Sequence, residues 1–334
     1  MKRIEILQFL RACGAFSVFL SHYLADFNIA YNNLSGQLGV AIFFIISGYL
    51  LIERTDYCDL NGYFLKKIVR IIPLYWLLTC VVIIIGLKNP QLLHTSVISL
   101  KAIVKSLFLI PDQVQNTGYV LPILPIAWTL YYELYVYVMF YLCIRICKER
   151  KKAGVLTTAI LLLLHILCNI VKCNNVYLNT YGGMVVLYFG VGMVTSILDN
   201  GQYERNERRI RKSSAVIFVL LFIIAEQFYG KLTYWKIILV GLVYMFIIYF
   251  IKKWSVPKFF INYGNISYSF YLLHYFVIKF FSRVINFNHE NVTGIIAGAI
   301  VTFAITYILS IISYKIMEKK FGVFLYKRLL KENN

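Results

Sequence analysis

Long apolar runs recur along the whole chain, and each is close to the length that crosses a membrane. A helix needs about 20 mostly apolar residues to cross the hydrocarbon core of a bilayer. Only helices and closed barrels satisfy all their backbone hydrogen bonds inside that core. We therefore expect an all-α, polytopic bundle of ten transmembrane helices at 5–24, 37–53, 70–87, 120–144, 154–171, 183–198, 214–229, 233–251, 264–285 and 292–314.

The composition excludes an ordinary water-soluble domain. Apolar residues make up 60% of the 334-residue chain and charged residues 15%, whereas soluble domains are about 45–50% apolar and about 25% charged. The formal net charge of +19 invites a nucleic-acid interpretation, but the basic residues form short clusters between apolar runs. No continuous basic face results. We expect membrane lipids and the phosphates of a bound cofactor as partners, and no nucleic acid.

The loops between the runs predict the orientation of the chain. Cytoplasmic loops of membrane proteins are enriched in Lys and Arg, and the basic clusters occur in alternate loops when the N-terminus is placed in the cytoplasm. Ten helices then put both termini in the cytoplasm. The stretch 96–110, with Lys101 and Lys105 one turn apart, fits an interfacial or re-entrant helix better than an eleventh span. We expect one transmembrane domain over 1–320 and a short basic cytoplasmic tail over 321–334.

Two polar residues of the first run share one helix face. Arg11 and His22 are eleven residues apart, so a helix points them within about 20° of the same direction, about 16 Å apart along its axis. A charged side chain inside a bilayer is costly, and its presence indicates a function or a paired partner. The two residues can contact the two ends of one long ligand. A snorkelling or ion-paired arginine and a core histidine are the structural alternatives.

Other polar residues lie inside later runs. Glu133 lies midway along the fourth run and needs a cation or hydrogen-bond donors there, or it stays protonated; Arg11 is a candidate partner. His274 lies centrally in the ninth run, with Tyr271 three residues earlier on the same face. A structural ion pair for Glu133 and a satisfied core histidine for His274 remain open.

The third run begins with Arg70, just before Pro73, where a basic residue is expected in any case. Ser47-Gly48-Tyr49 interrupts an otherwise aliphatic helix and can expose backbone to a cavity. The seven cysteines lack the spacing of a zinc site, so we expect no metal.

In this order, these residues resemble the acyltransferase-3 family of bacterial and eukaryotic membrane enzymes. The resemblance covers nearly the whole chain and rests on five motifs: Arg11 and His22 as an Arg-x10-His element, Gly39 to Tyr49, Arg70-Ile-Ile-Pro-Leu-Tyr-Trp76, Trp128-Thr-Leu-Tyr-Tyr-Glu133, and Ile266 to His274. Glu318 matches a Glu-Lys/Arg-Pro element of the family, except that Lys320 stands in place of the proline.

The resemblance implies a membrane-embedded O-acyltransferase, first of all an O-acetyltransferase, in the inner membrane of a bacterium. The implied donor is cytoplasmic acyl-CoA, usually acetyl-CoA. The implied acceptor is a hydroxyl of a cell-surface carbohydrate, such as exopolysaccharide, capsule, the O-antigen of lipopolysaccharide or a lipid-linked glycan. The alternative is a transporter or flippase of a glycan intermediate, because a ten-helix bundle with intramembrane charges fits that function too.

The residues then receive hypothetical roles. His22 would remove the proton of the sugar hydroxyl, because an imidazole pKa near 6.5 suits proton removal at neutral pH. Arg11 and Arg70 would hold the CoA phosphates or stabilise the thioester oxyanion, and Glu133 would orient or charge-balance a basic partner. An acyl-enzyme on Ser47 or on a histidine is not required. The expected catalytic residues are His22, Arg11, Glu133 and His274, and the expected donor-binding residues are Arg11, Arg70, Ser47, Tyr49, Trp128 and Tyr271.

Overall fold

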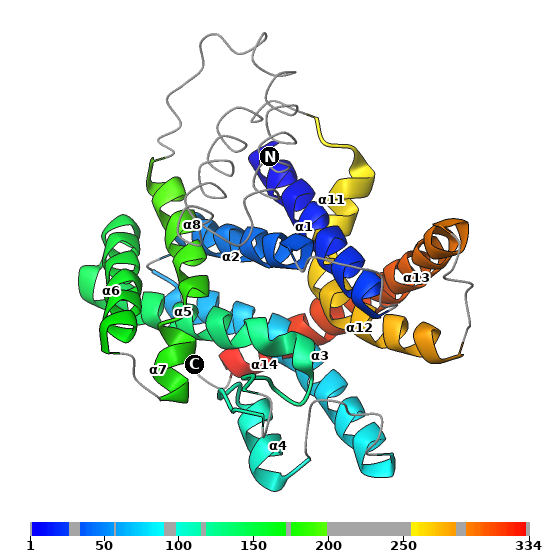
Figure 1. Cartoon of the computed structure of the whole chain (residues 1–334). Coiled ribbons are helices and arrows are strands. Elements are labelled where there is room, and N and C mark those ends of the chain that lie inside the picture. The colour runs from blue at the N-terminus through cyan, green and yellow to red at the C-terminus, as the bar shows by residue number, and fades with distance from the viewer. Residues whose placement is uncertain are drawn as a thin grey trace. The chain divides into compact units, whose positions relative to one another are not determined.

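The computed structural model describes residues 2–26, 34–56, 58–89, 98–114, 118–171, 175–198, 255–284 and 292–331 (Figure 1). The regular structure in these ranges is helical, and the extended backbone pairs only in one isolated bridge, between Gln113 and Val120. The elements are α1 (Lys2–Asp26), α2 (Leu34–Arg54), α3 (Leu60–Lys88), α4 (Leu100–Leu107), η2 (Pro125–Ala127), α5 (Trp128–Cys147), α6 (Arg150–Val171), α7 (Val176–Tyr181), η3 (Met184–Val186), α8 (Leu187–Leu198), α11 (Lys258–Asn265), α12 (Ser267–Val284), α13 (Val292–Ser313), η4 (Tyr314–Phe321) and α14 (Gly322–Lys331).

Six helical stretches of the described chain are long and apolar enough to cross a membrane, and they identify an integral membrane protein. They are Gly36–Arg54, Leu60–Lys88, Pro125–Cys147, Arg150–Val171, Val176–Leu198 and Val292–Leu329. Each overlaps a predicted span, so the all-α membrane fold is confirmed.

The remaining four predicted spans have different outcomes. The run 5–24 is helical as α1, and 264–285 is helical as the end of α11 and α12, but neither is among the six apolar stretches because both carry more polar and charged residues. The runs 214–229 and 233–251 lie outside the described residues. The count of ten helices, the cytoplasmic termini and the single domain over 1–320 stay predictions.

The chain folds as two compact units. The first unit comprises Met1–Leu50 with Tyr188–Ser310, and the second comprises Leu51–Leu187 with Ile311–Asn334.

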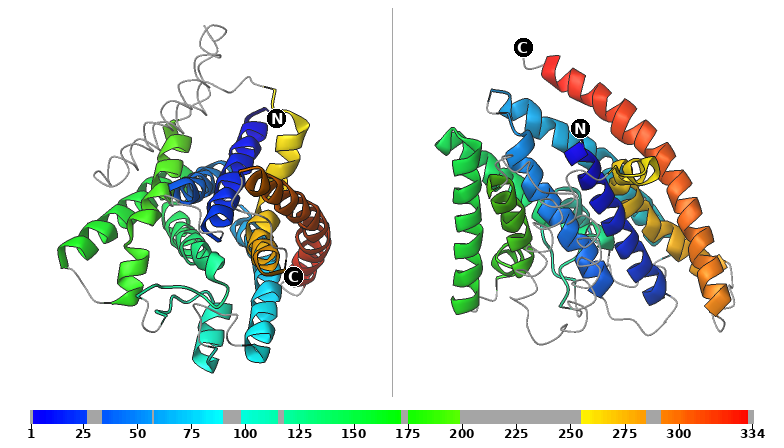
Figure 2. Two further views of the ribbon diagram at one scale, coloured as in Figure 1. Left: turned by 45° about the vertical axis from the view of Figure 1, so that its right-hand side comes forward. Right: turned by 90° about the horizontal axis from the view of Figure 1, so that it is seen from above.

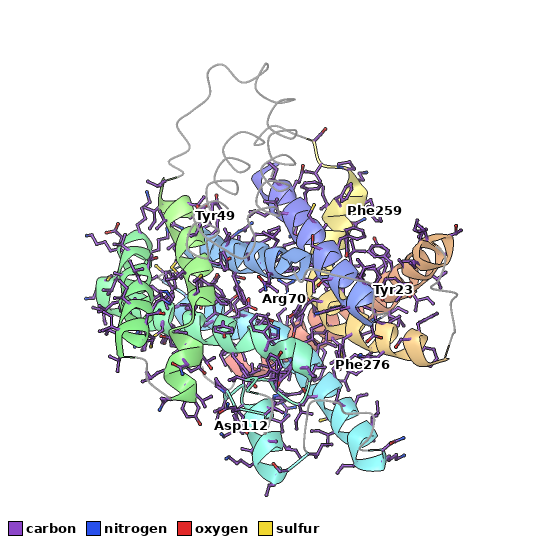
Figure 3. All side chains as sticks on the ribbon, in the orientation of Figure 1. Tyr23, Tyr49, Arg70, Asp112, Phe259 and Phe276 are labelled. Carbon is purple, nitrogen blue, oxygen red and sulfur yellow. The ribbon has the colours of Figure 1, made fainter. Side chains whose placement is uncertain are left out.

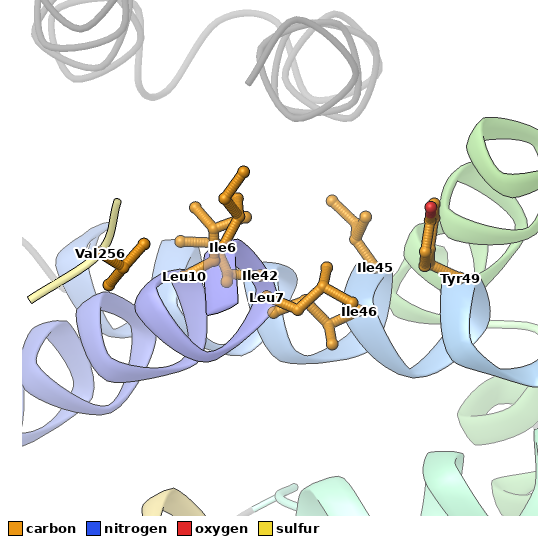
Figure 4. Close-up of a cluster of buried hydrophobic side chains, with 8 residues drawn as sticks. All are labelled: Ile6, Leu7, Leu10, Ile42, Ile45, Ile46, Tyr49 and Val256. Carbon is orange, nitrogen blue, oxygen red and sulfur yellow. The ribbon is translucent and has the colours of Figure 1, made fainter. Parts of the chain in front are cut away.

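In the first unit, α1 packs along both α11 and α12 (Figures 1 and 2). Small residues let α2 approach its neighbours closely. A Cβ atom on Gly39 would lie 2.5 Å from a backbone oxygen of α1, and one on Gly192 would lie 2.0 Å from a backbone oxygen of α2, so both positions exclude larger side chains. Beside these contacts, an apolar cluster joins α1, α2 and Val256 (Figure 4): Ile6, Leu7, Leu10, Ile42, Ile45, Ile46, Tyr49 and Val256.

In the second unit, α3 is the helix against which α4, α5, η4 and α14 pack. Asp59 caps its N-terminus, where the carboxylate accepts a hydrogen bond of 3.0 Å from the backbone N–H of Gly62. The helical turns of α13 continue through the π-helical segment η4 into α14. The predicted tail over 321–334 therefore begins as a helix packed on α3.

Candidate functional site

The two intramembrane histidines meet in the first unit, and we call them the His pair. His22 on α1 and His274 on α12 lie with Nδ1 of His22 2.8 Å from Nε2 of His274. Their ring planes differ by 5° and their centroids are 5.1 Å apart. Because parallel rings stacked face to face could not bring two nitrogens this close, the rings meet edge to edge in a hydrogen bond. The packing of α1 on α12 thus brings together two residues that are 252 positions apart.

The neighbours of His274 determine which nitrogens carry protons. Nδ1 of His274 lies 3.2 Å from the backbone carbonyl oxygen of Phe270. A carbonyl oxygen only accepts, so in neutral His274 the Nδ1 atom holds the proton and Nε2 is an acceptor. That acceptor requires the proton of neutral His22 to be on Nδ1, which leaves Nε2 of His22 with a lone pair. The hydrogen bonds therefore assign Nε2 of His22 as the basic atom of the pair.

Aromatic rings enclose His274 on several sides. Its ring centroid is 6.2 Å from that of Phe270, 5.8 Å from that of Tyr271 and 6.5 Å from that of Phe19. His274 is fully buried. Packing of this kind restricts the imidazole to one orientation and keeps bulk water from competing for its hydrogen bonds. The predicted neighbour Tyr271 thus contacts the His pair.

An ion pair that the sequence analysis missed joins the same two helices beside the His pair. The ammonium of Lys279 on α12 donates a hydrogen bond to the carboxylate of Asp26 on α1. Asp26 lies one turn after His22 on the same face of α1, and both charges are within electrostatic range of that imidazole. The spacing of four residues between His22 and Asp26 could have indicated this arrangement, because it puts both side chains on one face of a helix. The ion pair holds α1 against α12 at the end of the helices that carries the His pair.

The other predicted residues of the first unit lie on α1 and α2. Arg11 is half-buried on α1 and precedes His22 in one uninterrupted helix, as the spacing argument requires. Ser47 and Tyr49 are buried on α2. Tyr49 belongs to the apolar cluster of Figure 4, so it contributes to packing in this structure, and its donor-binding role stays a prediction.

In the second unit, Arg70 on α3 pairs with Glu318 on η4. The Nε atom of Arg70, which Figure 3 labels, donates a hydrogen bond of 2.8 Å to Glu318. The Arg70 side chain is 36% exposed and the Glu318 side chain 2% exposed, so the arginine compensates a nearly buried carboxylate. Although Lys320 replaces the proline of the family motif, Glu318 still makes this contact. Its π-helical setting is typical of functional positions.

One hydrogen-bond donor to Glu133 lies on the same helix. The hydroxyl of Tyr137, one turn later on α5, donates to the Glu133 carboxylate. Lys67 on α3 in turn lies 3.5 Å from the same hydroxyl, with its ammonium 5.1 Å from the centre of the Tyr137 ring. The ammonium of Lys67, the phenol of Tyr137 and the carboxylate of Glu133 are thus consecutive neighbours across α3 and α5. Lys67 and Tyr137 were not predicted, although Tyr137 shares the face of Glu133.

Trp128 is the first residue of α5 and packs edge-on against Tyr132 at a centroid distance of 5.7 Å. The described residues contain no group of three side chains suited to a metal ion.

Comparison with known proteins places this arrangement in a family. The chain matches the acyltransferase domain family over residues 4–312. It is 29% identical over 161 residues to the exopolysaccharide production protein ExoZ of Rhizobium meliloti (strain 1021), a match that covers 48% of this chain and 50% of that protein. It is 27% identical over 289 residues to ORF330 of Acidianus two-tailed virus, provisionally named an acetyltransferase, covering 80% of this chain and 78% of the viral protein.

The match to ExoZ thus spans about half the length of that relative. No solved structure matches the chain. The family match extends from α1 to the end of α13 and includes both members of the His pair. This chain belongs to the acyltransferase domain family.

Proposed function

We propose that this protein is an O-acyltransferase of the bacterial cytoplasmic membrane, which transfers an acetyl group from acetyl-CoA to a hydroxyl of a surface carbohydrate. Membership of the acyltransferase family supports the reaction class, and it favours an enzyme over the transporter alternative. The name of ExoZ links that relative to exopolysaccharide production, which supports a carbohydrate acceptor here. The observation that carries the proposal is the His pair, with its lone pair on Nε2 of His22.

The His pair suits general base catalysis. Nε2 of His22 takes the proton of the acceptor hydroxyl while the hydroxyl oxygen attacks the thioester carbonyl carbon. His22 becomes an imidazolium, and its Nδ1–H bond to His274 becomes charge-assisted and stronger. The carbon–oxygen bond forms and the carbon–sulfur bond breaks. The departing thiolate then takes the proton from Nε2 and leaves as the free thiol of CoA, so atoms and charge balance.

The basic residues suit the donor. Coenzyme A carries several phosphate charges, and a planar guanidinium binds phosphate in two places. In the proposal, Arg70 and Lys67 are the candidates for donor binding in the second unit, where Arg70 contacts Glu318 and Lys67 contacts Tyr137. Arg11, on the half of α1 away from His22, is a separate candidate for donor binding in the first unit. These roles remain proposals for each residue.

The test is acetyl transfer by the purified protein in nanodiscs. We expect radiolabelled acetyl-CoA to be consumed and the label to appear on surface polysaccharide from a strain that lacks the gene. His22→Gln should lower the rate on the order of 10²- to 10⁴-fold without a change in thermal unfolding. His165→Gln is the matched control, because His165 is also buried in a helix, with Nδ1 2.7 Å from the Gly182 carbonyl oxygen. Retained activity in His22→Gln, or no thioester consumption by the native protein, would contradict the proposal.

A further inference from the structure

A second polar cluster lies in the second unit, and we call it the tyrosine cluster. It consists of Tyr75, Lys105, Asp112, Tyr131, Tyr177 and Tyr181, from α3, α4, the segment that follows α4, α5 and α7. Four separate stretches of the chain, which are α3, α4 with the segment that follows it, α5 and α7, thus supply phenols and one ion pair to the same region.

Hydrogen bonds to the backbone hold the segment around α4 in place. The Tyr75 hydroxyl donates to the Ser106 carbonyl oxygen at 2.6 Å, and the Ser106 hydroxyl accepts from the N–H of Ile123 at 2.8 Å. Leu109, which lies between Ser106 and Ile123 in the sequence, is buried, and its backbone φ angle is 54°. A non-glycine residue in this conformation is strained and persists only where its surroundings enforce it. The segment is therefore preorganised, as a binding surface requires.

The Tyr131 hydroxyl is the feature that points to a ligand. The residue is 2% exposed and lies in the first turn of α5. Its hydroxyl has no hydrogen-bond partner among the described residues, although Tyr75, Asp112 and Tyr181 are within electrostatic range. A buried hydroxyl without a partner is costly and rare in folded proteins. A ligand hydroxyl that accepts from it and donates to a neighbour removes this cost.

The charged members of the cluster complement the phenols. Lys105 donates a hydrogen bond of 2.5 Å to Asp112, which Figure 3 labels, and its ammonium lies 5.8 Å from the centre of the Tyr177 ring. The hydrogen bond to Asp112 raises the pKa of Lys105, so the ammonium stays charged. Both side chains remain partly exposed, at 20% and 29%, and so retain atoms that can contact a ligand.

We propose that the tyrosine cluster binds the carbohydrate acceptor, with the Tyr131 hydroxyl and the Asp112 carboxylate hydrogen-bonded to sugar hydroxyls. Each sugar hydroxyl is both a donor and an acceptor, and phenols and carboxylates supply the matching groups. Aromatic rings such as that of Tyr177 provide apolar surface for the C–H faces of a sugar. With the N-terminus in the cytoplasm, the loop between the predicted spans 70–87 and 120–144 is external, and this loop contains α4, Lys105 and Asp112. The inference rests on the proposed function, because it names the site of the same acceptor.

The test compares Michaelis constants of variants for the two substrates. The probes are acetyl-CoA and the unacetylated surface polysaccharide of a strain that lacks the gene. Tyr131→Phe removes one buried oxygen that has no described partner, so the temperature of thermal unfolding should be equal to or higher than that of the native protein. Loss of one neutral hydrogen bond should raise KM for the polysaccharide roughly 2- to 13-fold, with KM for acetyl-CoA unchanged. Asp112→Asn should act in the same direction.

Tyr141→Phe is the matched control, because it removes a hydroxyl near the other end of α5, where Tyr141 donates to Asn61 at 2.7 Å. We expect its two KM values to equal those of the native protein. Unchanged polysaccharide KM in both Tyr131→Phe and Asp112→Asn would overturn the inference and leave the proposed function standing. A rise in acetyl-CoA KM alone would also overturn it, by assigning the cluster to the donor. Failure of the native protein to acetylate polysaccharide would contradict the proposed function instead.

Discussion

His274 provides a quantitative test of the His pair. In His274→Phe the new ring can occupy the aromatic surroundings of Phe19, Phe270 and Tyr271, so we expect the protein to fold. What the variant loses is the acceptor for the Nδ1–H of His22. In the transition state that N–H belongs to an imidazolium, and a hydrogen bond to a charged group contributes about 1.5–3 kcal/mol. We therefore expect kcat to fall roughly 10- to 150-fold.

This loss is smaller than the loss expected when the base itself is removed, which is on the order of 10²- to 10⁴-fold. His274→Gln should recover part of kcat, because the side-chain oxygen of Gln can accept the hydrogen bond from His22. The assay is initial-rate transfer of labelled acetyl groups at saturating acceptor, with thermal unfolding of each variant measured in the same nanodiscs.

Two results would refute this reasoning. One is native kcat in His274→Phe, which would show that the hydrogen bond contributes nothing to catalysis. The other is equal kcat in His274→Gln and His274→Phe when both unfold at the native temperature, because a role as hydrogen-bond acceptor predicts a difference. Restored rate in the Gln variant cannot come from packing alone.

Three further predictions concern the donor, the ion pair and the helix packing. Arg11→Lys should weaken acetyl-CoA binding measured by titration calorimetry, because the variant loses the planar guanidinium that binds phosphate in two places. His22→Gln should bind acetyl-CoA with native affinity. The reverse result would exchange the roles of Arg11 and His22. Glu318→Gln should lower the free energy of unfolding by about 1–3 kcal/mol because Arg70 loses its anionic partner; the 36% exposure of the Arg70 side chain makes this effect smaller than that of a fully buried pair. An unchanged unfolding transition would contradict this prediction. Gly192→Ala should reduce the yield of folded protein in detergent gel filtration, since its Cβ would lie 2.0 Å from a backbone oxygen of α2, and a native yield would show that the helices can separate.

The general fold could be predicted from sequence because the physics of the bilayer is simple. Apolar runs of about 20 residues must be helical, and six of the predicted runs appear as long apolar helices. The short helix α7, which precedes the sixth predicted run 183–198, could not be predicted in the same way. Asn175 caps α7, and the turns through η3 separate it from α8, whereas hydropathy averages over such local hydrogen bonding.

The sequence predicted the residues of the candidate site better than it predicted the contacts between them. His22 and His274 were each identified from their intramembrane positions, but only the packing of α1 on α12 shows that they form one hydrogen bond. Glu133 was expected to need a donor, and Tyr137 supplies it. The Asp26–Lys279 pair was missed because each residue lies near the end of a run, where a charge is ordinary. Pairing between distant segments is a tertiary property, and a single sequence does not record it.

In the His pair, Nδ1–H of His22 donates to Nε2 of His274, and Nδ1–H of His274 donates to the backbone carbonyl oxygen of Phe270. The Phe270 oxygen accepts a hydrogen bond but is far too weak a base to hold a proton, so α12 offers no onward path from His22. A proton that enters at Nε2 must leave through the same atom, and in the proposed reaction the sulfur of CoA receives it. Deprotonation of the sugar and release of the thiol are therefore two halves of one local exchange.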